Sequence, residues 1–102
     1  MTYKDRKEKC IMNVLKDIYI PQDYVRDIIG KYGADNQPVV CIEELSELQK
    51  ELCKAMRGKS DKDHITEEIT HCLISISVII EMMGIDKEKI QDNIVKKIEQ
   101  YG

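Results

Sequence analysis

Apolar residues recur at helical spacing along most of this 102-residue chain, and this periodicity limits how the chain can fold more than any other feature. In the segment VVCIEELSELQKELCKAM, one helical stripe consists of Cys41, Leu45, Leu48, Leu52 and Met56. Towards the C-terminus, Ile90, Ile94 and Ile98 recur every four residues. No segment alternates between apolar and polar residues over more than a few positions. The sequence therefore predicts an all-α protein.

Proline and glycine residues divide this pattern into a predicted four- to five-helix bundle. Pro21 ends the first helix, and the segment from Gly30 to Gly33 ends the second. Pro38 occupies the first position of the third helix, where its missing N–H costs nothing. The predicted helices span Lys4–Tyr19, Asp23–Lys31, Pro38–Met56, Asp63–Met83 and a last helix after Asp86.

Polar residues precede the later helices and are expected to cap them, because their side chains can accept hydrogen bonds from free backbone N–H groups. The expected caps are Asn36 or Gln37 for the third helix, Ser60, Asp61 or Asp63 for the fourth, and Asp86 for the last. Gly84 is expected to close the fourth helix.

The length of the chain fits a single domain over residues 1–102. A domain of this size buries only about two-thirds of the surface that its unfolded chain exposes, so its own core is modest. A second subunit would enlarge that core. We therefore expect a homodimer or a homotetramer.

Charge and hydropathy argue against several classes of partner. The chain has 16 Lys and Arg residues against 19 Asp and Glu residues, and no long basic run, which argues against nucleic acid or an anionic membrane surface. The start, MTYKDRKEKC, is charged, unlike the apolar core of a signal peptide. The longest apolar stretch, around Leu73–Ile80, is shorter than a bilayer span. We therefore expect a cytoplasmic protein that does not act at a membrane.

The cysteines form no CxxC pair and lie among aliphatic residues. This pattern favours free thiols in a reducing compartment over a disulfide framework or a zinc site. Free, buried thiols are expected for Cys10, Cys41, Cys53 and Cys72.

Acidic residues lie beside the apolar stripe of the third predicted helix, where Glu44, Glu47 and Glu51 form a neighbouring stripe. Such a stripe, taken alone, is typical of a solvated helix face with local Lys pairs. The fourth predicted helix begins with a second polar group, because Glu68, His71 and Ser75 share one face. That face continues into apolar residues, which indicates that its polar end also points towards the core.

Two pairs at i, i+3 spacing, Glu44 with Glu47 and Glu68 with His71, can converge on one cation if the two helices are antiparallel neighbours. Carboxylates held that close repel each other and are costly to desolvate, and a cation removes both costs. Oxygen-rich ligation suits Mg²⁺ or Mn²⁺ better than zinc. A hard cation in an acidic pocket in turn indicates a phosphorylated ligand.

At these residues the chain resembles the MazG-like family of all-α nucleoside triphosphate pyrophosphohydrolases, whose signature is EExxE on one helix and ExxD on the next. Here EELSE supplies Glu43, Glu44 and Glu47, and EITH supplies Glu68 and His71. The lead-in KYGADNQPVV is also similar to that of short, single-domain members encoded by phages and prophages. The resemblance extends roughly over residues 30–84.

The resemblance implies a metal-dependent enzyme that cleaves a nucleoside triphosphate, ribo- or deoxyribo-, to the monophosphate and pyrophosphate. The implied metal ligands are Glu44, Glu47, Glu68 and His71, for Mg²⁺ or Mn²⁺. Glu43 and Glu44 are the implied catalytic acids, with Glu43 holding a second metal or orienting the attacking water. Contacts with the phosphates or with the nucleotide are expected, on weaker grounds, from Gln37, Lys54, Arg57 and Lys59.

The chain departs from the family pattern at His71, which stands where the pattern has Asp. The departure leaves three outcomes open: an altered metal preference, His71 as a base or phosphate contact, or a helical dimer that binds a nucleotide or a protein without turnover. The Glu-x-x-His pair is also the ligand pattern of di-iron carboxylate bundles. One chain carries only one such pair in a suitable place, so a di-iron site would need a symmetric dimer.

Overall fold

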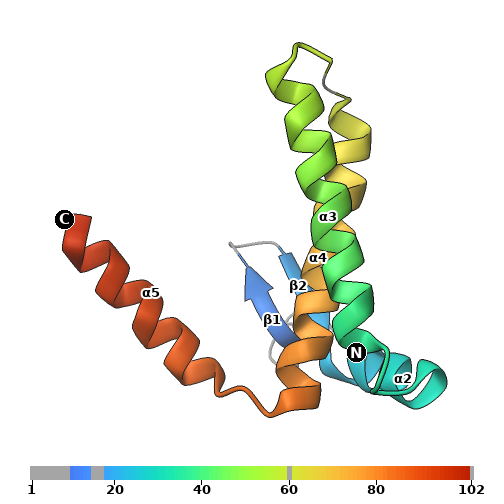
Figure 1. Ribbon diagram of the computed structural model, residues 1–102. Coiled ribbons are helices and arrows are strands. Elements are labelled where there is room, and N and C mark those ends of the chain that lie inside the picture. Colours follow the sequence, from blue (N-terminus) through green and yellow to red (C-terminus); the bar gives the residue numbers. More distant parts are fainter. Residues whose placement is uncertain (1–9, 15–17, 60, 102) are drawn as a thin grey trace.

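The computed structural model describes residues 10–14, 18–59 and 61–101, and helices make up most of them (Figure 1). The all-α expectation is therefore confirmed at the level of fold class, with one short hairpin as an exception. The helices are Gln22–Tyr32 (α2), Gln37–Met56 (α3), Lys62–Met83 (α4) and Lys87–Tyr101 (α5). The hairpin consists of Cys10–Val14 (β1) and Ile18–Pro21 (β2).

The hairpin shows that the predicted first helix, Lys4–Tyr19, is wrong where the structure describes it. β1 pairs antiparallel with β2, with Val14 opposite Ile18 and Asn13 opposite Tyr19. The segment is rich in β-branched residues, which lose side-chain freedom in a helix and pack well on a sheet. A short apolar run of this kind cannot be assigned to a helix or a strand by its spacing alone. The remaining residues of that prediction, 4–9 and 15–17, lie outside the described residues.

The core lies where α2 and β2 pack on the C-terminal half of α4. Its buried centre is formed by Ile20, Val25, Val78 and Ile80. Val25 of α2 is 0% exposed and Val78 of α4 is 1% exposed, so these two valines mark the closest packing. α2 ends at Gly33, whose φ of 82° favours glycine and whose N–H donates to the carbonyl of Ile29. The predicted second helix and its end are thus confirmed.

α3 and α4 form an antiparallel pair, and one end of this pair extends beyond α2 and the hairpin (Figure 1). Asp61 caps α4, because its Oδ1 accepts hydrogen bonds from the N–H groups of Asp63 and His64 at 3.0 and 3.2 Å. Gly84 closes α4 in the left-handed conformation, with φ 62° and ψ 37°. Asn36 holds the cap position of α3, but its side chain makes no capping hydrogen bond. Both helices lie within a residue of their predicted bounds.

α5 is capped as predicted, since Asp86 Oδ1 accepts from the N–H of Glu88 at 2.9 Å. The helix then runs away from α3 and α4 and does not complete the expected bundle (Figure 1). Among the described side chains of α5, only Ile90, near its start, packs against the core, whereas Ile94, Val95 and Ile98 are exposed. Among the described residues, no helix combines the length and the hydropathy that a membrane span requires.

Candidate metal site between α3 and α4

A hydrogen bond fixes how α3 and α4 lie against each other. The thiol of Cys72 on α4 donates to the backbone carbonyl of Glu44 on α3, with 3.2 Å between sulfur and oxygen. This contact brings the third turn of α3 opposite the middle of α4. His71 precedes Cys72, and Glu68 lies one turn earlier on the same face of α4. The two helices thus bring together side chains from both halves of the sequence pattern.

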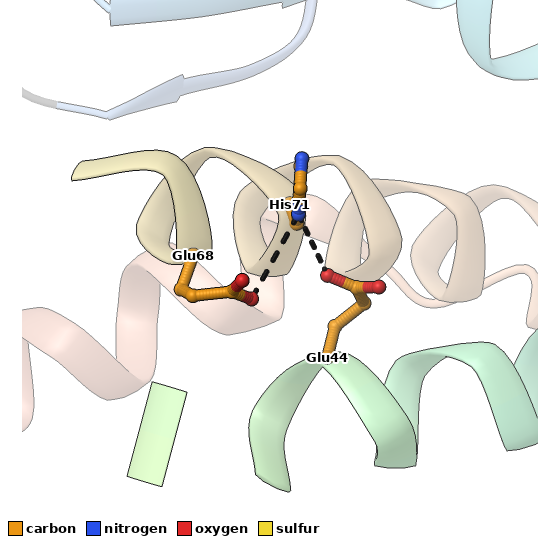
Figure 2. Close-up of side chains that lie close together, drawn as sticks. All are labelled: Glu44, Glu68 and His71. Atoms are coloured by element: carbon orange, nitrogen blue, oxygen red, sulfur yellow. Dashed lines mark ion pairs between the residues drawn. The ribbon is translucent and has the colours of Figure 1, made fainter. Parts of the chain in front are cut away.

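Glu44, Glu68 and His71 converge at this point (Figure 2). One ligand atom from each of the three lies within 4.8 Å of the others. Nδ1 of His71 is 3.0 Å from Oε2 of Glu44 and 3.8 Å from Oε2 of Glu68. An imidazole nitrogen and two carboxylate oxygens at these separations can bind one cation, because all three are ordinary ligands of divalent metals.

The carboxylates of this cluster contain buried oxygen atoms that make no hydrogen bond. Oε2 of Glu44 and Oε2 of Glu68 are buried and make no hydrogen bond, and each lies in ion-pair contact with Nδ1 of His71. A buried carboxylate oxygen without a hydrogen bond is costly, and a bound cation would satisfy both oxygens at once. The residues present therefore fit a divalent cation, with carboxylate oxygens and one imidazole nitrogen as its ligands.

Two other predicted site acids on α3 do not join the cluster. Glu43 and Glu47 are exposed, and neither belongs to the group of convergent ligands among the described residues. Glu47 lies only three residues after Glu44, but the packing of α3 on α4 turns Glu44 inward and Glu47 towards the solvent. Glu47 as a metal ligand and Glu43 as a catalytic acid stay predictions.

Glu51 is the inward-facing acid that sequence reasoning missed. It is 8% exposed, and its Oε2 is buried without a hydrogen bond. Its Oε1 lies 3.2 Å from Nζ of Lys54. The signal was present in the spacing, because a residue seven positions after Glu44 returns to the same helix face after two turns.

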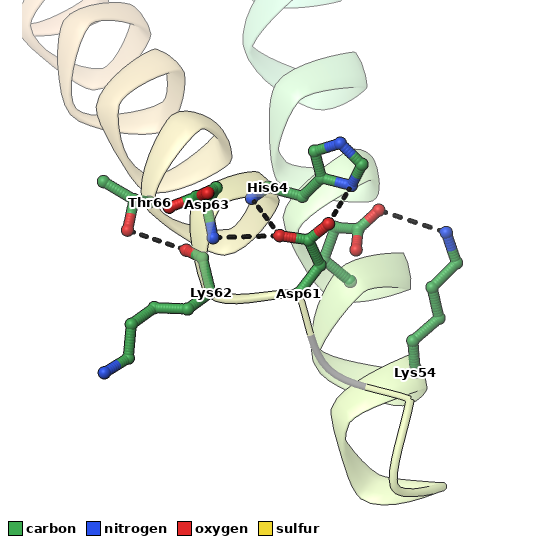
Figure 3. A network of polar contacts seen from close by, with 7 residues as sticks. Lys54, Asp61, Lys62, Asp63, His64 and Thr66 are labelled. Atoms are coloured by element: carbon green, nitrogen blue, oxygen red, sulfur yellow. Dashed lines mark hydrogen bonds and ion pairs between the residues drawn. The ribbon is translucent and has the colours of Figure 1, made fainter.

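The predicted phosphate contacts lie towards the far end of α3. Lys54 is ten residues after Glu44, or about 15 Å along the helix axis, and its ion pair with Glu51 lies near the turn where Asp61 caps α4 (Figure 3). Arg57 and Lys59 are exposed beyond Lys54. Gln37 lies at the opposite end of α3 and is buried, with its Nε2 donating to the carbonyl of Gly33 at 3.1 Å.

Two thiols flank the cluster but do not extend its ligand set. Cys41 and Cys72 are free and buried, as predicted, whereas Cys53 is free but exposed. Burial raises the pKa of the Cys72 thiol, and the carboxylates of Glu44 and Glu68 raise it further. Burial, followed by the charge of Glu44, also raises the pKa of Cys41. Only a thiolate binds a metal well, so these two side chains favour the protonated, hydrogen-bonding form. The side chain of Cys10 lies outside the described ones.

Comparison with protein-family models, with curated proteins and with solved structures finds no match to this chain. The interpretation of the cluster therefore rests on the residues of the chain and on their geometry.

Proposed function

We propose that the protein is a metal-dependent nucleoside triphosphate pyrophosphohydrolase with a fold of the all-α NTP pyrophosphatase type. The observation that carries this proposal is the convergence of Glu44, Glu68 and His71 across the two helices that bear the resembling motifs. The buried oxygens of both glutamates, which make no hydrogen bond, support a divalent cation at this point. Mg²⁺ and Mn²⁺ are the proposed ions, because two of the three ligands are carboxylates.

Three protein ligands leave coordination positions for phosphate oxygens and water, as a catalytic metal site requires. When bound, the cation supplies positive charge against the triphosphate and acidifies a nearby water molecule. The water oxygen bonds to the α-phosphorus, and the bond from that phosphorus to the α–β bridging oxygen breaks. Pyrophosphate leaves, and the monophosphate keeps the new oxygen. Glu43, exposed beside the cluster, is the proposed acceptor of the proton that the water loses.

The exposed part of the apolar stripe on α3 supports the proposal of a homodimer or homotetramer. Leu45, Leu52 and Met56 of this stripe are 45, 48 and 89% exposed, and the neighbouring Ile42 is 62% exposed. The sequence predicts most of this stripe as a core face, and within one chain only Cys41 and Leu48 turn away from solvent. A contiguous apolar face of this kind is typical of an interface between proteins. We propose that a second copy of the chain covers it.

The proposed reaction is tested by incubating the purified protein with each common NTP and dNTP, in Mg²⁺ and separately in Mn²⁺. We expect equal amounts of monophosphate and pyrophosphate. Glu44→Gln should lower the rate by about tenfold to a hundredfold or more, because it removes a charged ligand. Glu88→Gln, the same change at an exposed position on α5, is the matched control and should leave the rate unchanged.

Glu47→Gln, in the same assay, tests whether the ion has four protein ligands, including Glu47, or only the three convergent ones. A loss as large as that of Glu44→Gln would make Glu47 a ligand, as the resemblance implies. A small loss would restrict the ligands from the protein to the three convergent side chains. Absence of a monophosphate product with every triphosphate and both ions would contradict the proposed reaction and favour a helical protein that binds without turnover.

A further inference from the structure

A second concave feature lies beside the metal cluster, between α2, the start of α3 and α4. Its volume is about 460 Å³, within the range of small-molecule sites. Tyr24 and Tyr32 of α2 line it and are 47 and 61% exposed. They lie about two turns apart along the helix, so the ring of either can form part of the cavity wall. Most of the remaining lining is aliphatic.

Two buried polar side chains in this cavity have hydrogen-bonding capacity that the described residues leave unused. Gln37 is 6% exposed and donates from Nε2 to the carbonyl of Gly33, which fixes its amide plane and leaves Oε1 without a donor. Ser75 is 8% exposed, and its hydroxyl makes no hydrogen bond to any described residue. Neither Oε1 of Gln37 nor Oγ of Ser75 is among the fully buried atoms of the described residues that lack a hydrogen bond, so both open onto the cavity and can bond to a polar ligand there.

The cavity and the metal cluster lie along the same interface between α3 and α4. Val40, which lines the cavity, precedes Glu44 by one turn, and Ser75 follows His71 by one turn. One turn of four residues is about 6 Å along the helix axis. A ligand with phosphates at the cluster could therefore place a ring, joined by a sugar, in the cavity.

We propose that this cavity binds the planar, nitrogen-containing ring of a nucleoside and selects among rings by their hydrogen-bonding edge. The ring stacks on Tyr24 or Tyr32, whose flat faces suit any base. Oε1 of Gln37 accepts a hydrogen bond from the ring, so the cavity favours a base whose N–H donor stands at the position on the ring edge that this oxygen reaches. The hydroxyl of Ser75 donates to or accepts from the same edge. The position of phosphates at the cluster rests on the proposed function, whereas binding of the ring does not.

Nucleosides without phosphates test this proposal, because they need no cation. Each common nucleoside is titrated to millimolar concentration into ¹⁵N-labelled protein free of divalent metal, and the spectra are followed by NMR. We expect saturable shifts of the Gln37 side-chain amide and of the backbone amides near Ser75 for a subset of the nucleosides. Ser75→Ala and Tyr32→Leu should each weaken binding about threefold to tenfold. Ser46→Ala, the same deletion at an exposed position on α3, should not.

The outcomes separate this proposal from the proposed reaction. Glu44→Gln should lower the rate of triphosphate turnover and leave nucleoside binding intact. Nucleoside binding without turnover would support the cavity and contradict the reaction. The cavity proposal would be contradicted if nucleosides cause no NMR shifts, turnover is equal for all bases, and Ser75→Ala and Tyr32→Leu leave KM unchanged. That result would not affect the proposed reaction.

Discussion

At the scale of single residues, the imidazole of His71 is the feature that most shapes the proposed chemistry. It lies 3.0 Å from a carboxylate oxygen of Glu44, at the position where the family that the chain resembles has the aspartate of its ExxD motif. A neutral nitrogen in place of a carboxylate lowers the negative charge of the site and suits Mn²⁺ or Co²⁺ better than Mg²⁺. The sequence predicts a cluster of four ligands, Glu44, Glu47, Glu68 and His71, because each helix carries its own part of the pattern. Of these, the structure brings Glu44, Glu68 and His71 together.

His71→Asp should therefore increase Mg²⁺-dependent activity, or Mg²⁺ affinity, on the order of tenfold, because it adds an oxygen ligand and a charge. The measurement is turnover or metal binding across a Mg²⁺ titration. His64→Asp makes the same change at the exposed start of α4 and should leave the Mg²⁺ response as it is. An unchanged or weaker Mg²⁺ response in His71→Asp would show that residue 71 does not contact the ion.

The buried thiol of Cys72, beside the cluster, and the exposed thiol of Cys53 should differ sharply in reactivity. Because burial and the neighbouring carboxylates raise the pKa of Cys72, less of its thiolate is present at any given pH, and alkylation should be slow. Cys53 is exposed and should react first. Treatment of the native protein with iodoacetamide at pH 8, followed by peptide mass spectrometry, compares the two sites directly. Equal labelling of Cys72 and Cys53 at early times would contradict the packing of α4 on α3.

At the scale of elements, the later helices were predictable and the first segment was not. Proline, glycine and aspartate act locally, so Pro38, Asp61 and Gly84 mark helix ends that sequence reasoning could find. Pairing of β1 with β2 depends on residues that meet only after the chain turns back. The cavity beside Gln37 could not be predicted from the sequence for the same reason, since it depends on where α2 lies against α4.

One ion pair links α2 to the end of α4 and should make the free energy of unfolding depend on pH. Glu81 accepts from Arg26 at 2.8 Å and from Gln22 at 3.2 Å, and the hydrogen bond from Arg26, then that from Gln22, lowers the pKa of Glu81. Its stabilising contribution is thus present above the unfolded pKa of about 4.3 and is lost as the pH falls through the lower folded value. Because the side chain of Arg26 is 63% exposed, the expected size is only about 0.2–1 kcal/mol.

Urea unfolding of the wild type and of Glu81→Gln at pH 7 and pH 3 measures this contribution. The variant should be less stable at pH 7, and the difference should shrink at pH 3. Glu88→Gln serves as the control for loss of an acid at an exposed site. A deficit of equal size at both pH values would show that ionisation of Glu81 is not what stabilises the contact.

At the scale of the whole molecule, apolar surface remains exposed on two helices that point in different directions. α3 exposes Leu45 and Leu52, and α5 exposes Ile94 and Ile98 as it leaves the packed domain (Figure 1). A chain of this size buries too little surface for such faces to be incidental. The arrangement favours an assembly in which neighbouring copies complete the core.

Light scattering after size-exclusion chromatography should therefore give a mass of two or four chains. Replacing both Leu45 and Leu52 with Lys should shift the protein towards the monomer, because charge on an apolar interface is costly to desolvate. Asp27→Lys changes the charge at an exposed position on α2, outside this face of α3, and should leave the mass unchanged. A monomeric wild type across the accessible concentration range would rule out the proposed assembly.

The antiparallel pair of α3 and α4 has a consequence for heat resistance. Glu44 comes from one helix and Glu68 and His71 from the other, so an ion held by all three also ties the helices together. A ligand that binds only the folded state at a hundredfold excess over its Kd adds about 2.7 kcal/mol to the free energy of unfolding. Mn²⁺ should therefore raise the melting temperature of the wild type but not of Glu44→Gln, and EDTA should reverse the rise. A melting temperature that does not change with any divalent ion would show that no cation binds between α3 and α4. Otherwise, calorimetry alone could rank the ions that the protein prefers, with no nucleotide present.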